Sequence, residues 1–204
     1  MIETWARKNH FNFYKNFTDP SFNICFSMEI TKAYEYAKDN EMSLFLVLMF
    51  LSSQACNSVE AFKTRLDTDN RPYIVNRVEP SATVAQENGL FNFCNMVHHC
   101  RLSDFIAANS QLVDAAKAEE PLANVDNRDY QIFYSITPWL SFTGYKHAHS
   151  GSGSDIPKIV FGKVEEVDGK VTMPVSVELH HAIADAIDIA KYQESFTEYM
   201  QSLA

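Results

Sequence analysis

Apolar residues recur along this chain with the periods of strands and helices. Near its end, the β-branched, apolar stretch from Val171 to Val177 predicts a strand. A helix is predicted next, over 185–203, because apolar side chains recur there at roughly helical spacing, at Ile187, Ala190, Phe196 and Met200. The sequence Glu178-Leu179-His180-His181 therefore lies where a strand passes into a helix, a position that exposes side chains at the rim of a sheet.

Further strands are predicted from alternation and β-branched content, at 22–31, 71–78, 81–86, 131–136 and 158–164. We expect 71–78 to pair with 81–86 around Glu79-Pro80. We also expect 158–164 to pair with 171–179 through Val167-Asp168-Gly169-Lys170, because Asp-Gly is a hairpin signal.

Three more helices are predicted. One covers 32–40, and a longer one covers 41–59, which is apolar nearly all round and should be buried. The third begins at the candidate N-cap Ser103 and should face the core with Phe105, Ile106, Leu112 and Ala115. Helices and strands in this mixed order predict an α+β fold, an α-β two-layer sandwich with a mixed β-sheet and helices packed on one face. No repeat or long linker interrupts the chain, so we expect residues 1–204 to form one domain.

Composition narrows the class of protein. The net charge of −9 argues against a nucleic-acid surface and against attraction to an anionic membrane. The longest apolar run, Leu44 to Leu51, is too short to span a bilayer. Four cysteines do not form a disulfide framework in a chain of this size, and no signal peptide is evident near Glu3 and Arg7. A reduced, cytoplasmic protein is the simplest expectation.

The residues themselves offer three candidate sites. A neutral imidazole of the His180-His181 pair could act as a general base, although a structural role at the strand end is the alternative. Cys94, His98, His99 and Cys100 are metal-ligating types, but three of them are consecutive and cannot easily converge on one ion, so we expect packing rather than a metal. His147 and His149 lack a third ligand nearby and indicate a surface or pocket role.

Three motifs together carry a resemblance. His180-His181-Ala-Ile-Ala-Asp185-Ala186 resembles the His-His-x-x-x-Asp-Gly signature of the chloramphenicol acetyltransferase family, with Ala186 in place of the glycine. A Trp-x-Arg-x-x-His-Phe-x-Phe-Tyr pattern of that family is matched by Trp5, Arg7, His10, Phe11, Phe13 and Tyr14. A serine shortly before Pro-Trp is matched by Ser135 ahead of Pro138-Trp139.

The resemblance implies an acyltransferase that moves an acetyl group from acetyl-CoA directly to a hydroxyl, with chloramphenicol as the acceptor. His181 would be the general base and Ser135 would hydrogen-bond the oxyanion. Arg7 would form an ion pair with Asp185 and hold the histidine loop. Breaking such a pair, if buried, costs roughly 3–5 kcal/mol.

The resemblance also implies binding residues and an assembly. Acceptor-binding positions fall on Phe13, Tyr14, Tyr145 and His147, and cofactor-binding positions on Lys163 and Trp139. The family forms homotrimers with active sites at subunit interfaces. Two departures concern the acceptor: His147 stands at an apolar position of the family and Val160 at a threonine. Two alternatives therefore stay open, an acetyltransferase for another small alcohol or amine, and a trimeric small-molecule binding protein that has lost turnover.

Overall fold

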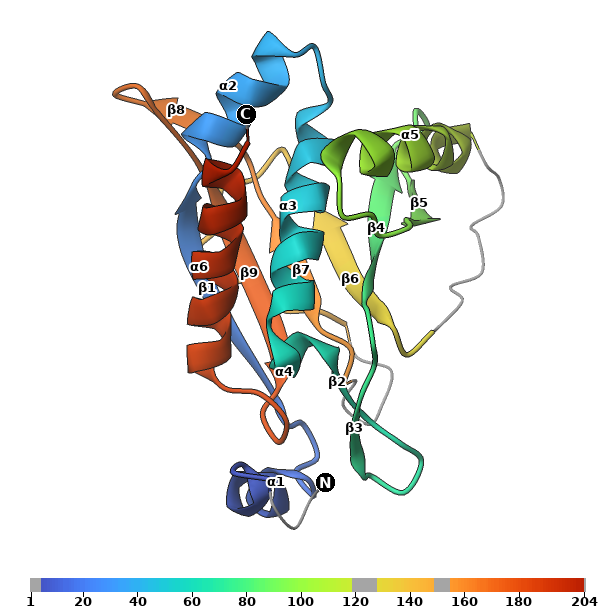
Figure 1. Cartoon of the computed structure of the whole chain (residues 1–204), viewed down its shortest axis with the longest axis vertical. Coiled ribbons are helices and arrows are strands. Elements are labelled where there is room, and N and C mark those ends of the chain that lie inside the picture. The colour runs from blue at the N-terminus through green and yellow to red at the C-terminus, as the bar shows by residue number, and fades with distance from the viewer. Residues whose placement is uncertain (1–4, 119–127, 149–154, 204) are drawn as a thin grey trace.

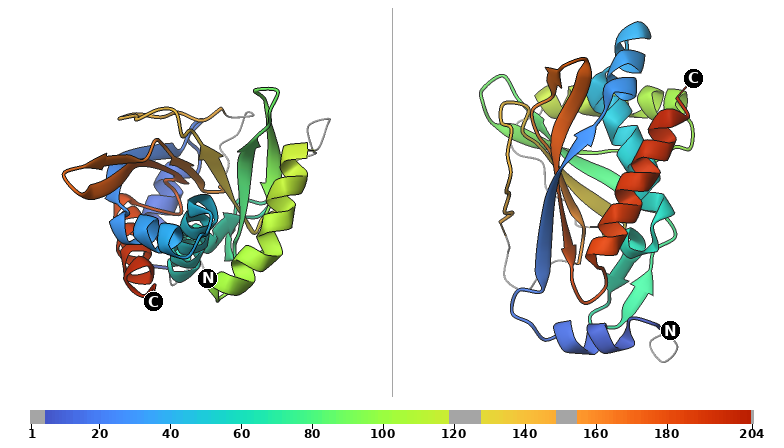
Figure 2. Two further views of the ribbon diagram at one scale, coloured as in Figure 1. Left: turned by 90° about the horizontal axis from the view of Figure 1, so that it is seen from above. Right: turned by 90° about the vertical axis from the view of Figure 1, so that its left-hand side faces the viewer.

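The computed structural model describes residues 5–118, 128–148 and 155–203. A mixed β-sheet forms one layer, and the long helices pack on one of its faces, with α3 (Leu44–Ser58) lying between α5 (Leu102–Ala118) and α6 (Ala186–Gln201) (Figure 1). The side view shows the helices on one side of the sheet and the trace of residues 137–148 on the other (Figure 2). This arrangement confirms the predicted α+β sandwich.

The remaining elements are three shorter helices and the strands of the described residues. The other helices are α1 (Lys8–Tyr14), α2 (Thr31–Asp39) and α4 (Glu60–Lys63). The strands are β1 (Ser21–Glu29), β2 (Thr64–Leu66), β3 (Pro72–Ile74), β4 (Glu79–Ala85), β5 (Phe91–Asn95), β6 (Gln131–Ile136), β7 (Lys158–Phe161), β8 (Glu165–Val167) and β9 (Lys170–His180). Of the described helices, none is both long and apolar enough to cross a bilayer.

The main sheet has the strand order β1-β9-β7-β6-β4-β5, with β8 also paired to β9. The pairs β4–β6 and β6–β7 are parallel, whereas β1–β9, β7–β9 and β4–β5 are antiparallel. The strands β6 and β9 therefore run in opposite directions. The predicted Asp-Gly turn is present, with positive φ at Asp168 and Gly169, 53° and 75°. It joins β9 to the short strand β8, whereas the predicted partner strand ends at Phe161 and pairs with β9 separately as β7.

Alternation in β9 sends two kinds of side chain to the two faces of the sheet. Val171, Met173, Val175, Val177 and Leu179 join the hydrophobic core under the helices. The polar residues between them, including Ser176, Glu178 and His180, point to the opposite face and are nevertheless buried. The helix-free face of the sheet is therefore a polar face that is shielded from solvent.

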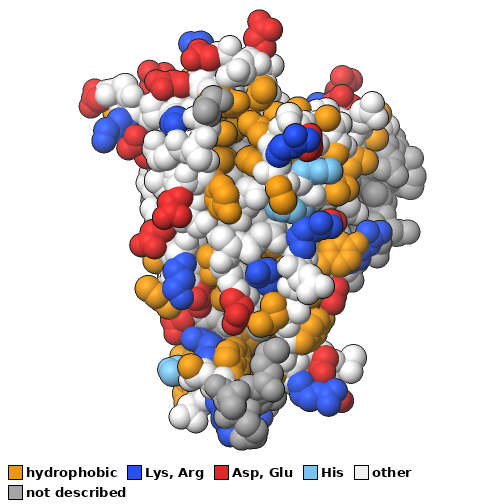
Figure 3. Space-filling view, viewed as in Figure 1, with side chains coloured by type: hydrophobic (Ala, Val, Ile, Leu, Met, Phe, Trp, Pro, Cys, Tyr) orange, Lys and Arg blue, Asp and Glu red, His pale blue; other side chains and the backbone are white. Residues whose placement is uncertain are grey.

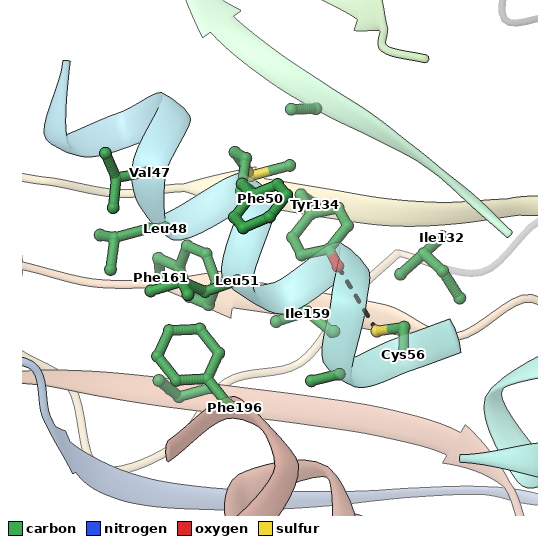
Figure 4. Close-up of a cluster of buried hydrophobic side chains, with 14 of the residues drawn as sticks. Val47, Leu48, Phe50, Leu51, Cys56, Ile132, Tyr134, Ile159, Phe161 and Phe196 are labelled. Carbon is green, nitrogen blue, oxygen red and sulfur yellow. Dashed lines mark hydrogen bonds between the residues drawn. The ribbon is translucent and has the colours of Figure 1, made fainter. Parts of the chain in front are cut away.

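The core lies between the sheet and α3, whose residues from Leu46 to Cys56 are all buried, as the uniformly apolar sequence predicted. Leu51, Phe161 and Phe196 pack together there, and the hydroxyl of Tyr134 lies 3.5 Å from the sulfur of Cys56 (Figure 4). The outer side of the helices carries acidic and basic side chains interspersed with one another (Figure 3).

The predicted pairing of 71–78 with 81–86 is wrong. Residues 72–74 form β3, which pairs with β2 in a separate small sheet, while β4 pairs with β5 and β6. Glu79 and Pro80 belong to β4 itself rather than to a turn. Asn57 causes the separation, because its side chain bonds both the N–H and the carbonyl of Val78 and ties the chain before β4 to α3.

Two predicted helix faces are also wrong in part. Leu112 and Ala115 of α5 point to solvent, while Val113 and Ala116 are buried. The helix begins at Leu102, so that Ser103 lies within it, and its buried stripe passes through Asn109, which bonds the backbone of Val97. In α6, Ile187 and Ala190 are exposed, and the buried positions are instead Ile189, Tyr192, Phe196 and Met200.

Candidate active site

A tight loop connects β9 to α6 and carries the histidine pair. The N–H groups of Ile183 and Ala184 both bond the carbonyl of His180, at 3.0 and 3.1 Å, and the N–H of His181 bonds the carbonyl of Pro20 at 2.8 Å. Asp185 then begins the helix as its N-cap, in a capping box with Asp188. The loop is therefore fixed at its start by backbone hydrogen bonds and at its end by the helix cap.

Arg7 binds this loop from the other end of the chain. Its guanidinium donates to the carbonyls of His181 at 2.6 Å, of Ala182 at 3.2 Å and of Ala184. A further bond, 3.2 Å long, goes to the carboxylate of Asp185. Three of its four acceptors are thus backbone carbonyls, so that Arg7 fixes the conformation of the loop more than it neutralises one charge.

The ion pair of Arg7 and Asp185 is only partly buried. The side chains are 15% and 39% exposed, so the cost of stranding a fully buried charge does not apply here. Burial disfavours the charged carboxylate, but bonds from the N–H of Ala186 and from Arg7 outweigh it and lower the pKa of Asp185. Ala186 has no positive φ, so the absence of the glycine of the family signature places no strain on the loop.

The ring of His181 has a defined tautomer in its neutral form. Its Nδ1 lies 3.2 Å from the carbonyl oxygen of Ala184, which can only accept a hydrogen bond, and 3.4 Å from Nη2 of Arg7. Both hydrogens of that Nη2 already go to the carbonyls of His181 and Ala184, so Nδ1 carries the hydrogen and donates it to Ala184. Nε2 then holds the lone pair. The ring stacks on Tyr14 at 4.1 Å between centroids and contacts Phe22 at 4.5 Å, which fixes its plane. His181 therefore presents its proton-accepting nitrogen, Nε2, in one orientation.

His180 is placed differently. Its side chain is buried, and its Nδ1 accepts the N–H of Ala182 at 3.2 Å, so that nitrogen is used in holding the loop. Burial lowers the pKa of His180 and keeps the ring neutral. Of the two histidines, His181 is the one whose free ring nitrogen is available for chemistry.

Ser135 lies far from His181 within one chain. Ser135 pairs with Val160, which pairs with Ser176. Two strand spacings and the residues from 176 to 181 then separate Ser135 from His181 by about 19 Å. The strands β6 and β9 run in opposite directions (Figure 1). Ser135 near the end of β6 and His181 just after β9 therefore stand toward opposite ends of the sheet.

The side chain of Ser135 points to the helix-free face of the sheet. Its neighbour Tyr134 is buried in the core, so alternation turns Ser135 the other way. Within the described residues its hydroxyl makes no hydrogen bond, which leaves it available to a bound molecule. Trp139 and Lys163 are more open: Trp139 is 69% exposed, and the ammonium of Lys163 lies 3.1 Å from the carboxylate of Glu165.

The predicted acceptor residues fall into two groups. Phe13 and Tyr14 lie on α1. The ring of Tyr14 stacks on His181, and the ring of Phe13 meets that of Tyr14 edge to face. Tyr145 and His147 follow β6 and contact each other, with ring centroids 4.9 Å apart. This second group lies over the polar face of the sheet, where His147 bonds Glu178, three residues before His181.

Sequence reasoning missed Glu178 and Lys158. The carboxylate of Glu178 accepts from the ammonium of Lys158 at 3.1 Å and from Nδ1 of His147 at 3.3 Å, and all three side chains are nearly buried, 6–11% exposed. Burial opposes ionisation of Glu178, but the bonds from His147 and Lys158 outweigh it and lower its pKa to about 2. Charged residues at alternate positions of otherwise apolar strands were the available signal.

The Cys94–Cys100 segment is packed rather than gathered around an ion. His98 is buried and its Nδ1 lies 2.9 Å from the hydroxyl of Ser53, while Cys100 is exposed. Burial, with help from Arg77 and His99, lowers the pKa of His98 to about 4. In the part of the chain that the structure describes, no three His, Cys, Asp or Glu residues are placed to share a metal; His149 lies outside it.

Comparison with known proteins identifies the family. The sequence model described as chloramphenicol acetyltransferase matches residues 1–197. The chain belongs to the chloramphenicol acetyltransferase family. It is therefore an acyltransferase by family, and the match covers all three of the motifs from Trp5 to Asp185.

Individual relatives of this chloramphenicol acetyltransferase family member agree over nearly their full length. Chloramphenicol acetyltransferases of Campylobacter coli and Clostridium perfringens are 24% and 27% identical to it, over 98% and 94% of this chain and 96% and 89% of theirs. A solved chloramphenicol acetyltransferase has a TM-score of 0.91 at 24% identity, covering 98% of this chain and 97% of its own. A dihydrolipoamide acetyltransferase of Azotobacter vinelandii shares the fold at a TM-score of 0.68 and 12% identity, over 96% and 86%.

Proposed function

We propose that this protein is an acetyl-CoA-dependent O-acetyltransferase that transfers acetyl directly to a hydroxyl of a small molecule, with chloramphenicol as the acceptor. His181 acts as the general base and Ser135 stabilises the oxyanion. The observation that carries the proposal is the fixed tautomer of His181, with Nδ1 on the carbonyl of Ala184 and the lone pair on Nε2. A base of this kind typically contributes roughly 10²–10⁴-fold.

The acetyl group moves from CoA to the acceptor, and the proton moves the other way, from the acceptor through His181 to the CoA thiolate. Nε2 of His181 removes the proton of the acceptor hydroxyl while its oxygen bonds to the thioester carbonyl carbon. The carbon–sulfur bond then breaks, and the protonated His181 returns the proton to the departing thiolate. Arg7 and Asp185 are positioning residues in this scheme, because they hold the loop and do not touch the reacting atoms.

The hydroxyl of Ser135 donates to the oxygen of the thioester carbonyl as it becomes an oxyanion. The separation of Ser135 and His181 in one chain, about 19 Å, is too large for them to act on the same carbonyl. We therefore propose that His181 of one chain faces Ser135 of a neighbour in a homotrimer. A cyclic arrangement of identical contacts closes such a ring with three equivalent sites.

The other residues divide between the two substrates. Phe13 and Tyr14 beside His181, and Tyr145 and His147 on the polar face, would enclose the acceptor. Trp139 and Lys163 would contact the CoA part, since both are accessible and Lys163 can exchange Glu165 for a phosphate. Residues 1–204 would form one domain, a proposal supported by the single large core under the helices. We also propose a cytoplasmic location, as expected from the sequence.

A coupled assay tests the activity. Purified protein is mixed with acetyl-CoA and chloramphenicol, then with a panel of other small alcohols and amines, and free CoA thiol and acetylated product are both measured. We expect acceptor-dependent thiol release that equals product formed and that is lost in His181→Gln. Binding of acetyl-CoA without acceptor-dependent thiol release across the whole panel would instead indicate a binding protein.

A further inference from the structure

The polar face of the sheet carries a connected cluster of three side chains, His147, Glu178 and Lys158. Lys158 and Glu178 are register partners on β7 and β9, and His147 reaches the same carboxylate from the segment after β6. By alternation, Ser135, Lys158 and Glu178 all point to this one face. The cluster and the proposed oxyanion residue therefore share a surface that the helices do not cover (Figure 2).

The distance between them suits one small molecule. Ser135 is in register with Val160, and Val160 with Ser176. The paired residues Lys158 and Glu178 lie two positions from Val160 on β7 and from Ser176 on β9. Two strand spacings and two residues place the Cα atoms of Ser135 and Glu178 about 12 Å apart. The ring of His147 contacts Tyr145 and bonds Glu178, so it lies over the same face of the sheet as Ser135, at a separation that a drug-sized acceptor can bridge.

We propose that His147, oriented by Glu178, is a specificity-determining residue that accepts a hydrogen bond from a second hydroxyl group of the acceptor. This inference rests on the proposed acetyl transfer and names the substrate class, a small alcohol with a second hydroxyl besides the one acetylated. The second hydroxyl donates to Nε2 of His147. Glu178 and Lys158 are positioning residues that do not touch the acceptor.

The hydrogen-bond pattern of the ring supports this role. The carboxylate of Glu178 is ionised near neutral pH and can only accept, so Nδ1 of His147 carries the proton and Nε2 of the neutral ring carries the lone pair. Within the described residues Nε2 has no partner, although the side chain is only 11% exposed. A nearly buried acceptor of hydrogen bonds that is left without one favours a ligand that supplies the donor.

The charge balance explains why the ring is held there. Lys158 already neutralises Glu178, so the cluster does not need His147 in order to avoid a buried unpaired charge. His147 is accordingly not required as a counter-ion. The ion pair of Lys158 and Glu178 is a fixed support that orients the imidazole, and removing the ring leaves that pair intact.

A pair of matched acceptors tests the inference. Chloramphenicol and 1-deoxychloramphenicol differ in one hydroxyl, which is not the primary hydroxyl that would be acetylated. If the panel assay identifies a different alcohol, that alcohol and its analogue without the second hydroxyl replace them. We expect the wild-type kcat/KM to be at least about tenfold higher for the acceptor with two hydroxyls. His147→Leu should bring the ratio close to one, mainly by raising KM for that acceptor.

Two further variants separate recognition from folding. His147→Gln keeps a polar group and should retain part of the preference. His99→Leu, the same replacement in the segment before α5, is the matched control and should change nothing. Equal kcat/KM for the two acceptors in the wild type, or a preference that survives His147→Leu, overturns the inference while acetyl transfer itself stands. Absence of transfer to every acceptor overturns both.

Discussion

Replacing Arg7 should destabilise the protein and slow acetyl transfer far more than replacing Asp185, although the two form one ion pair. Arg7 is 15% exposed and donates to three backbone carbonyls as well as to the carboxylate. Arg7→Ala leaves those carbonyls without their donor, and we expect a loss of about 3–4 kcal/mol in the free energy of unfolding. Turnover should fall about 100-fold, because the loop that aims His181 is no longer held.

Replacing Asp185 should lower the free energy of unfolding by less, and its two contributions, the helix cap and the ion pair, can be separated. Asp185→Ala removes an N-cap, worth about 1 kcal/mol, and a partly exposed ion pair, worth at most about 1 kcal/mol. Asp185→Asn keeps the cap and loses only the charge, so its cost should be under about 1 kcal/mol. The coupling energy in a double-mutant cycle is then limited to about 1 kcal/mol, the worth of the single shared contact.

Chemical denaturation and steady-state turnover, measured on Arg7→Ala, Asp185→Ala, Asp185→Asn and the double variant, test this ranking. Arg7→Lys is the matched control: it keeps the charge but lacks the geometry for several carbonyls, so it should rescue little. Rescue by lysine, or an Asp185→Asn variant as damaged as Arg7→Ala, would mean that charge neutralisation rather than the carbonyl bonds holds the loop.

Three further predictions concern other residues. Ser135→Ala should lower kcat about 10²–10³-fold with little change in the acceptor KM, because its bond forms mainly to the oxyanion; a rise in KM at unchanged kcat would make Ser135 part of the binding wall instead. His98 has a pKa of about 4 in the folded chain, below its ordinary value near 6.5, so the unfolded chain binds more protons between these pH values. The free energy of unfolding should therefore fall as the pH drops from about 6.5 to about 4. A pH series of denaturation curves should show this slope, and His98→Asn should flatten it. Ala186→Gly should leave kcat unchanged and cost up to about 1 kcal/mol of stability, since the loop needs no positive φ there; a gain in activity would show that the departure from the family signature matters.

The sequence predicted the elements whose signal is local. The burial of α3, the hairpin at Asp168-Gly169 and the strand before His181 follow from uniform hydrophobicity, a turn dipeptide and β-branched content, and each is present in the structure. The contact of Arg7 with Asp185 was accessible only through the resemblance, because no local pattern links residues so far apart in sequence.

Two of the errors arise where a polar side chain bonds the backbone of another segment. Asn57 separates β3 from β4 by bonding the backbone of Val78, and Asn109 lies on the buried stripe of α5 by bonding that of Val97. Hydrophobic periodicity assigns such residues to the surface. The buried Lys158 and Glu178 were missed for the same reason, since each is compensated by a partner on another element.

Mixing two inactive variants tests most directly the claim that one site combines His181 of one chain with Ser135 of another. Ser135→Ala and His181→Gln chains are unfolded together in equal amounts and refolded, and acetyl transfer is compared with each variant refolded alone. Random assembly into closed trimers gives about one quarter of the sites both native residues, so we predict about a quarter of the wild-type rate. A mixture that is no more active than the two variants separately would contradict the account.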